Sequence, residues 1–266
     1  MTKSTYISKN ITQSQLEFIR QLDDLELDIF SLPQLINILH GQKENINEIL
    51  ENLVNKKVLT RIERGKYCRP NFKDESVIGC HIVEDGCVSY WTALNKHGLT
   101  EQFPNTVFIQ TTKQKSDKTI FGVKYQFVRV PLKKHTAIKL YGFGNHQYKI
   151  TEVEKTIVDC FDLPEYSGGY AELIRAFNEA KLNPKKLIEA CQSIQNISVT
   201  KRLGFLAELL EKKKLKQFIT FAKKQVNEKY NLFDPQGSNT GKFINDWRLR
   251  LNITQEEIQN ICNKAY

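Results

Sequence analysis

The stretch SLPQLINILHGQKENINEILENLVNKKVLTRIERGKYCRP, residues 31–70, decides how the first part of the chain folds. Serine followed two residues later by proline is typical of a helix start, because serine caps exposed backbone N–H groups and proline fits the first turn. This helix is expected to reach His40 and to stop at Gly41. Beyond that tight turn, apolar residues on one face predict a second amphipathic helix over 43–57, namely Ile46, Ile49, Leu50 and Leu53.

The flanking segments complete a recognisable order of elements. Residues 58–70 predict two short strands around a turn at Arg64 and Gly65. Upstream, 12–24 has a helical pattern, and 25–30 alternates apolar and acidic residues like a short strand. Helix, strand, helix, turn, helix and basic hairpin is the order of a winged helix-turn-helix. We therefore predict a DNA-binding domain over 1–75; a small helical cap without a ligand is the alternative.

The charges of this domain are divided unevenly. The helix over 43–55 has one lysine and three glutamates (Glu44, Glu48 and Glu51), whereas 56–69 holds six bases and one acid. Phosphate contacts dominate DNA affinity, so the wing is expected to hold the backbone. The expected DNA-binding residues are Gln42, Lys43, Asn45 and Asn52 at the helix flanks for base contacts, and Arg61, Arg64, Lys66 and Arg69 on the wing.

Residues 76–266 predict a larger mixed α/β region, so the whole chain is expected to be of the α/β (α+β) class. A helix over 90–97 begins at Ser89 and ends at Gly98. Strands are expected at 106–111, 120–123, 125–130 and 148–150, followed by a helix capped by Thr151. Four amphipathic helices follow within 171–228. A late strand should place Trp247, Leu249 and Leu251 on one face, before a last helix capped by Thr254.

Composition narrows the class of protein. No apolar run is long enough for a membrane span, and the N-terminus lacks the apolar segment of a signal peptide, so we expect a cytoplasmic protein without membrane contact. The six cysteines form no CxxC pair, and no zinc or other metal site is expected. The GSNTGK sequence at 237–242 departs from a phosphate loop in spacing and lacks its Ser/Thr. We expect neither catalytic residues nor a cofactor.

The surplus of positive charge suggests an anionic partner. The chain has 39 Lys and Arg against 30 Asp and Glu, a net charge of +9. Residues 200–229 alone carry nine bases and three acids. They are expected to form a basic surface toward nucleic acid or an acidic partner, although a solvated helix end would explain them equally well. The residues of this surface are Lys201, Arg202, Lys212, Lys213, Lys214, Lys216, Lys223 and Lys224.

Several motifs in order resemble the AbiEi family of antitoxins and transcriptional regulators. They are YWTALNKHGLTEQFPNTVFIQTT at 90–112, EKTIVDCF at 154–161, Gly168 with Gly169, and RLGFLAELL at 202–210. With the preceding winged helix, the resemblance covers roughly 12–252. These regulators belong to type IV toxin–antitoxin systems, which act in abortive infection as phage defence. The resemblance implies that 90–112 is a scaffold motif of an antitoxin domain spanning 76–266.

The resemblance also implies the partners. The winged helix would bind inverted repeats in the promoter of its own operon and repress it. The cognate toxin would be a nucleotidyltransferase encoded alongside, without a stable toxin complex. We expect a monomer in solution and two copies on DNA. Two alternatives stay open: a nuclease-like enzyme targeted by the winged helix, and an antitoxin that binds its toxin directly without binding DNA.

Overall fold

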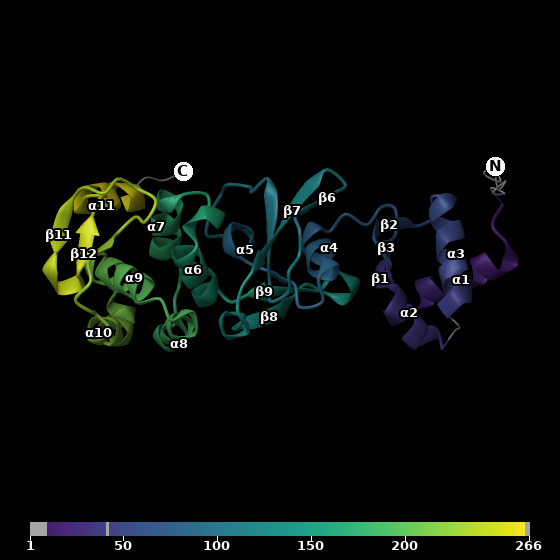
Figure 1. The fold of residues 1–266 in the computed structure, drawn as a ribbon, viewed down its shortest axis with the longest axis horizontal. Helices are drawn as coiled ribbons and strands as arrows, with labels where there is room; N and C mark the ends of the chain where they lie inside the picture. The colour runs from purple at the N-terminus through teal and green to yellow at the C-terminus, as the bar shows by residue number, and fades with distance from the viewer. Residues whose placement is uncertain (1–9, 41–42, 264–266) are drawn as a thin grey trace.

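The computed structural model describes residues 10–40 and 43–263, and for residues 43 and 44 the backbone alone. The chain forms an elongated molecule in which three parts follow one another along the long axis (Figure 1). The winged helix lies at one end and a six-stranded sheet in the middle, while helices and a small three-stranded sheet form the other end. The predicted mixed α/β class is confirmed.

The first part has the predicted order of elements. It consists of α1 (Gln13–Asp24), β1 (Ile29–Ser31), α2 (Leu32–Leu39), α3 (Lys43–Asn55), β2 (Thr60–Glu63) and β3 (Lys66–Cys68). Ser31 begins α2 as predicted, because its side chain accepts from Gln34 N while the Gln34 side chain accepts from Ser31 N. The three helices enclose an apolar core that includes Leu22, Leu35 and Leu50. The three strands pair antiparallel in the order β1-β3-β2.

The central sheet is covered by helices on both faces. Its strands run in the order β6-β7-β5-β4-β9-β8. They are β4 (Cys87–Val88), β5 (Thr106–Thr111), β6 (Lys118–Ile120), β7 (Val123–Arg129), β8 (Ile138–Tyr141) and β9 (Tyr148–Thr151). Side chains alternate along a strand, so Val107 and Ile109 pack on the side of α4 (Glu75–Ile82) while Phe108 packs with α5 (Tyr90–Lys96). The connection after β7 contains the short 3-10 helix η1 (Leu132–Lys134).

The small sheet of the winged helix shares a core with the central part. Ile29, Ile62 and Cys68 lie in the same apolar cluster as Val77 and Ile78 of α4. The winged helix is thus joined to the middle of the molecule by apolar packing as well as by the chain. The predicted division after residue 75 stays a prediction, because this cluster crosses it.

Two predictions for the middle of the chain were wrong in detail. A break at Gly122 was expected, but the strands on either side have other bounds than 120–123 and 125–130, because Phe121 and Gly122 form a hairpin turn with φ of 52° and 82° between β6 and β7. Thr151 ends β9, and the helix after it is capped at Glu152. Neither β4 nor β8 was predicted. The predicted left-handed conformation of Gly98 is confirmed, with φ of 68°.

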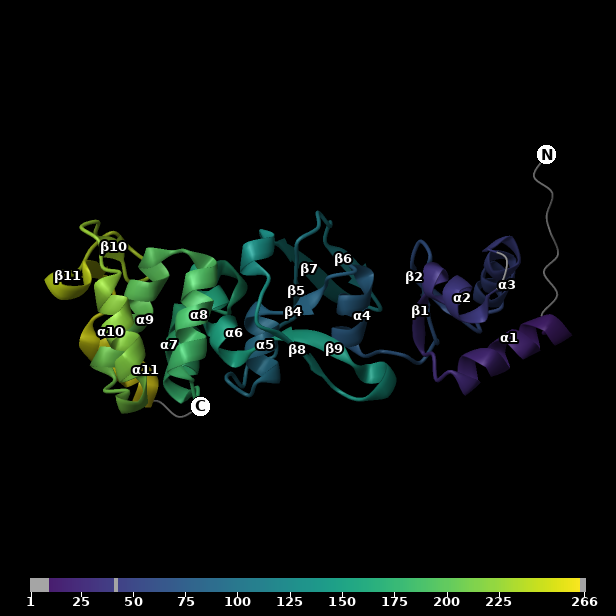
Figure 2. The same ribbon diagram turned by 90° about the horizontal axis from the view of Figure 1, so that it is seen from below.

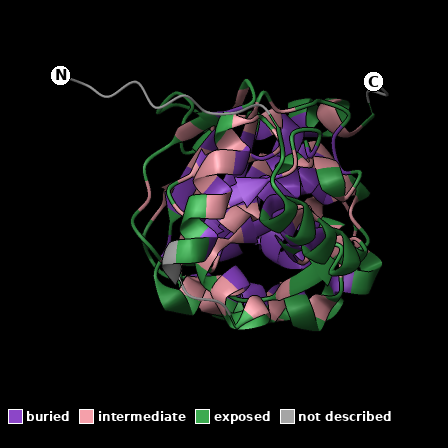
Figure 3. Cartoon of the chain, turned by 90° about the vertical axis from the view of Figure 1, so that its right-hand side faces the viewer, coloured by how far each residue is buried: buried purple, intermediate pink, exposed green. Residues whose placement is uncertain are grey.

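The last part is built from stacked helices that close on the three-stranded sheet. The helices are α6 (Val153–Asp162), α7 (Tyr170–Glu179), α8 (Pro184–Ile194), α9 (Ile197–Leu209), α10 (Lys216–Lys224) and α11 (Gln255–Asn263). Figure 2 shows α6, α8, α9 and α10 following one another toward the end of the molecule. Leu203, Phe218 and Phe233 are among the fully buried residues of the shared core. In an end-on view, buried segments lie inside a shell of exposed ones (Figure 3).

The late strand is bent where a straight one was predicted. The chain forms β11 (Lys242–Ile244), a 3-10 turn (Asn245–Trp247) and β12 (Leu249–Leu251), with β10 (Asn231–Leu232) on the other side of β12. Arg248 adopts φ of 46° and reverses the chain between the two strands. Trp247, Leu249 and Leu251 are all buried, but the Trp247 ring belongs to the turn and not to a strand.

Candidate nucleic-acid interface

A groove runs between α3, the start of α2 and the hairpin of β2 and β3, which forms the wing. Its volume is about 860 Å³. It is lined by Ser31, Leu32, Pro33, Asn47, Glu51, Arg61, Arg64, Gly65, Lys66, Tyr67 and Glu84. Three of the four basic wing residues predicted to bind DNA therefore line the same groove.

The three bases of this groove differ in how they are held. Arg64, at the wing turn, is exposed and makes no ion pair or hydrogen bond with the described residues. Arg61 donates to Glu51 across the groove at 3.1 Å. Lys66 points inward at its tip and donates to the carbonyl of Ile82; burial lowers its pKa, and nearby Glu63 only partly offsets this. Arg64 is thus the base most readily offered to a ligand.

The wing is fixed to the central part by a small charge cluster. Glu63 accepts from Lys115 at 2.5 Å and from Lys118 at 3.4 Å, both from the connection and strand after β5. Burial raises the pKa of Glu63, but the two lysines outweigh it and the net shift is downward. The single acid of the wing therefore serves as an anchor, and the hairpin is presented in one position.

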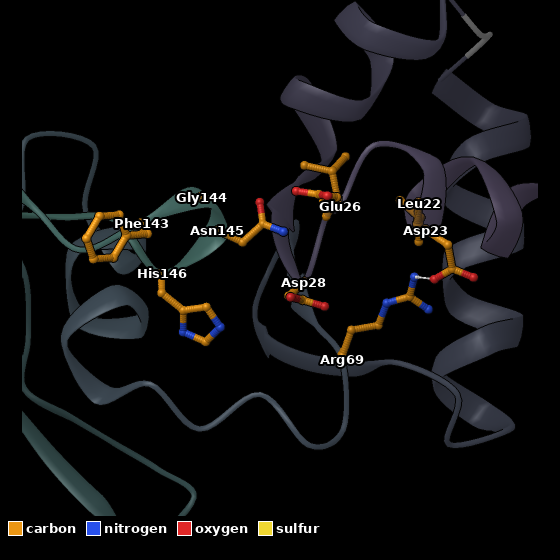
Figure 4. Close-up of a pocket in the computed structure, with 10 residues that line it drawn as sticks. Leu22, Asp23, Glu26, Asp28, Arg69, Phe143, Gly144, Asn145 and His146 are labelled. Atoms are coloured by element: carbon orange, nitrogen blue, oxygen red, sulfur yellow. Dashed lines mark hydrogen bonds and ion pairs between the residues drawn. The ribbon is translucent and has the colours of Figure 1, made fainter.

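Arg69 lies elsewhere. Its guanidinium pairs with Asp23 of α1 in a separate hollow of about 460 Å³, which also includes Phe143 and His146 from the β8–β9 connection (Figure 4). The structure does not bring Arg69 together with the groove bases. Its ion pair instead ties β3 to the end of α1.

The α3 residues that line the groove are not the ones predicted. Asn47 and Glu51 face it, one helical turn apart. Asn45 and Asn52 lie on another side of the helix, toward α1, where Lys56 donates to Gln15 at 2.7 Å. Gln42 and the side chain of Lys43 lie outside the described residues, as does the side chain of Glu44. Asn47 was missed because only the position of the wing distinguishes it from other exposed asparagines.

The prediction that Lys201 and Arg202 belong to a basic surface is wrong. Residues 199–207 of α9 are all buried, since other elements cover the helix on every side. The Lys201 ammonium donates to Lys229 O at 2.6 Å, Asn227 Oδ1 at 3.2 Å and Arg248 O at 3.3 Å. Burial and neighbouring cations lower its pKa to about 8. Arg202 donates from Nε to Leu232 O at 3.0 Å.

The other lysines of that set have mixed positions. Lys212 is partly buried and donates to the carbonyl of Asn178, while Lys223 pairs with Glu208. Four of them are exposed without an ion pair among the described residues: Lys213, Lys214, Lys216 and Lys224. The predicted surface is therefore reduced to these four, of which Lys213, Lys214 and Lys216 lie at the turn between α9 and α10 and Lys224 lies at the far end of α10.

Parts of the motif at 90–112 pack in the interior, whereas 101–103 lie on the surface. The Trp91 ring lies against Gly168, where an added Cβ would sit 2.5 Å from Trp91 Cε2. His97 donates from Nε2 to the carbonyl of Thr151 at 2.8 Å, and burial lowers its pKa. Both contacts join α5 to later segments of the chain, as expected of a scaffold motif.

A buried polar network continues from this motif. His135 Nδ1 contacts Gln110 Oε1 at 3.2 Å, and Gln110 donates to Asp159 Oδ2 at 3.2 Å. Asp159 forms an ion pair with Lys155 one turn earlier on α6, and both side chains are buried. At the other end of the network, His135 donates from Nε2 to Asp85 O at 2.9 Å.

Asp85 yields a prediction about acid stability. Burial raises its pKa, but hydrogen bonds from Thr111 and Thr112 outweigh this and lower it to about 2. A depressed carboxyl pKa contributes stability above its unfolded value and loses that contribution as pH falls through the folded value. We expect Asp85→Asn to lose about 1 kcal/mol at neutral pH, because solvent around this partly exposed carboxyl screens the interactions that lower its pKa. In urea unfolding from about pH 6 down to about pH 2, the difference from wild type should close below about pH 4; a constant difference would contradict the assignment.

No helix in the described ranges has both the length and the apolar character needed to cross a membrane.

Comparison with known proteins finds a similar structure but no similar sequence. No protein-family model and no curated protein matches the chain. A solved structure does: the crystal structure of the RV2827C protein from Mycobacterium tuberculosis, with a TM-score of 0.64. The match covers 97% of this chain and 97% of that chain at 12% sequence identity. The chain thus shares the fold of that mycobacterial protein over nearly its whole length.

Proposed function

We propose that this chain binds duplex DNA in the groove between α3 and the wing, and that it serves as the antitoxin and autorepressor of an AbiEi-type system. The observation that carries the proposal is the position of Arg61 and Arg64 in one groove beside the exposed side of α3. The motifs resembling AbiEi proteins support the antitoxin role.

The geometry suggests how the groove would work. The fixed wing carries Arg64 to the edge of the groove, where it reaches a phosphate. A second phosphate would compete with Glu51 for Arg61, since the pair is largely exposed and weak. Asn47, with one amide donor and one acceptor, is placed to read a base edge. Glu51 would repel a misplaced backbone and so restrict the register.

We expect Arg61→Ala/Arg64→Ala to weaken binding to any duplex and to reduce the slope of log affinity against log salt by about 2 units, because each phosphate contact contributes about 0.9. The measurement is fluorescence anisotropy at several salt concentrations. One duplex carries the sequence upstream of the chain's own reading frame, and a second carries a shuffled sequence.

The matched control also removes two exposed charges, but away from the groove: Lys96 and Lys185 to alanine. This variant should keep the wild-type slope. An unchanged slope in the arginine variant would remove the wing from the interface. Wild-type protein that fails to distinguish the two duplexes would favour the alternative in which the antitoxin acts without operator binding.

The antitoxin role predicts rescue in cells. Expression of the nucleotidyltransferase encoded beside this chain should arrest growth, and co-expression of the chain should restore it. Reversal of the four exposed lysines (Lys213, Lys214, Lys216 and Lys224) to glutamate tests whether the α9–α10 turn takes part. Rescue lost with operator binding intact would assign antitoxicity to this turn. Rescue retained would leave these lysines as a solvated helix end.

A further inference from the structure

The end of the molecule opposite to the winged helix carries a second cationic surface, built on the sheet β10-β12-β11 (Figure 1). Two aromatic rings and two guanidinium groups interleave there. The rings of Tyr230 and Phe243 meet edge to face at 5.0 Å. Arg248 lies 5.2 Å from the Tyr230 ring, and Arg250 lies 5.1 Å from the Phe243 ring. We name these four residues the arginine–aromatic platform.

Neither arginine of the platform has a carboxylate partner among the described residues. Arg250 donates from Nη1 to Asn239 Oδ1 at 2.9 Å and from Nε to Gly241 O at 3.3 Å. Arg248 donates to the Tyr230 hydroxyl at 3.1 Å. All these acceptors are neutral, so both positive charges remain uncompensated by their immediate partners. An anion that approached the platform would therefore meet two guanidinium groups whose charge no carboxylate of the described residues pairs with.

Charges beneath and beside the sheet strengthen this effect. The buried cations Lys201 and Arg202 donate only to neutral oxygens of the segments that form the sheet. The cations in and under the sheet are Lys201, Arg202, Lys229, Lys242, Arg248 and Arg250, and the carboxylates of the same segment are Glu228, Asp234 and Asp246. Lys201 and Arg202 hold the sheet from beneath, and the bases of the sheet segment itself exceed its acids by one, with Lys229 and Lys242 exposed beside the platform.

The platform is held rigidly. The 234–241 loop, which holds all but the last residue of the GSNTGK sequence, folds back on β12. An added Cβ at Gly241 would lie 1.8 Å from Leu251 O, so the loop touches the strand directly. Asn252 donates to Asp234 O at 2.8 Å and to Ser238 O at 3.1 Å. This loop supplies the two acceptors that orient Arg250, which is thereby preorganised for a ligand.

We infer that the arginine–aromatic platform binds single-stranded nucleic acid. The Phe243 side chain is 52% exposed although it is a large apolar group, so part of its ring remains open to a ligand. An unstacked base would stack on the Phe243 ring, and the Arg250 guanidinium next to that ring would contribute a cation–π contact. The flanking Lys229 and Lys242 would contact phosphates. Duplex bases are already stacked on each other and cannot use such a ring, which selects a single strand. This inference does not depend on the proposed function of the winged helix.

The test uses the full chain and labelled oligothymidine and oligouridine of about twelve nucleotides, within the usual site size for such surfaces. Wild-type protein should bind at low salt with an affinity that falls as salt rises. Phe243→Leu keeps an apolar side chain but removes the ring, and should weaken binding about tenfold, as expected for one lost base stack. Phe243→Tyr should bind like wild type. Arg250→Lys, which keeps the charge but loses the planar group, should also weaken binding.

Two controls separate this surface from the groove. Phe243→Leu should bind the upstream duplex as wild type does, and Arg61→Ala/Arg64→Ala should bind oligothymidine as wild type does. Because Phe243 is half exposed, its variants are expected to unfold at the wild-type temperature. Absence of oligonucleotide binding by wild type, equal affinity of Phe243→Leu and wild type, or loss of binding in the groove variant would each overturn the inference. Preference for one oligonucleotide would identify the strand as DNA or RNA.

Discussion

Replacement of Lys155 by methionine is expected to lower the free energy of unfolding by about 3–5 kcal/mol, because it leaves the buried carboxylate of Asp159 without its cation. The side chains of Lys155 and Asp159 are 0% and 2% exposed, so water cannot substitute for the lost partner. Gln110 would remain as a single donor at 3.2 Å. Urea unfolding at neutral pH measures the loss.

The stability of the Lys155→Met variant should also depend on pH in a definite direction. Burial raises the pKa of Asp159, and the opposing pull of Lys155 disappears in the variant. A carboxyl with a raised folded pKa holds its proton more tightly when folded, so the stability of the variant should fall as pH rises. The deficit should therefore be larger at about pH 8 than at about pH 5. Lys155→Met/Asp159→Leu, which removes both charges, should recover most of the stability; a single variant within about 1 kcal/mol of wild type would contradict the buried pair.

Replacement of Gly204 by alanine is expected to destabilise the last part of the chain by about 2–3 kcal/mol through overpacking. The added Cβ would lie 2.4 Å from Trp247 Cζ3 and 2.7 Å from Ala222 Cβ. The ring cannot easily withdraw, since its Nε1 donates to Glu208 at 2.7 Å and the side chain is buried. Alanine adds roughly 1 kcal/mol of helix propensity, which is too little to offset the clash.

A double-mutant cycle tests whether the tryptophan is the cause. Trp247→Phe removes the outer ring atoms that meet the new methyl group, so the combined variant should lose less stability than the two single changes added together. Gly98→Ala is the matched control, because it has φ of 68° and nothing within 4 Å of its added Cβ. It should lose about 1 kcal/mol from backbone strain alone. If the losses of unfolding free energy from Gly204→Ala and Trp247→Phe simply add, the clash with Trp247 is not the cause of the destabilisation.

Local chemistry was enough to predict the winged helix. Ser31 caps the next helix through atoms three residues away, and Gly65 adopts φ of 73° in the turn that sequence placed between two strands. The apolar spacing of Ile46, Leu50 and Leu53 predicted the buried face of α3. Signals of this kind depend on neighbours within one or two turns, so they can be read from the chain without knowledge of its tertiary contacts.

Edge strands and surface lysines had no such local signal. In β8, Lys139, Leu140 and Tyr141 are all exposed, so no alternation of apolar and polar residues marks a strand. Pairing with β9 is what makes this segment a strand. Lys201 looked like part of a solvated lysine cluster, yet three acceptors from residues 227–248 hold its ammonium in the interior.

The helices of the winged helix, the turn of its hairpin, the basic character of that hairpin and the mixed α/β class of the rest could be predicted from the chain alone. Contacts between distant segments were needed to show that Asn47 and not Asn52 faces the wing, that Arg69 pairs away from the groove, and that Arg250 lies beside Phe243. The reason is physical: a cap or an amphipathic face is set by residues adjacent in the chain, whereas a binding surface is set by which distant segments meet. The residues of the platform and the groove follow no periodic pattern in the sequence, so these contacts between distant segments cannot be predicted from it.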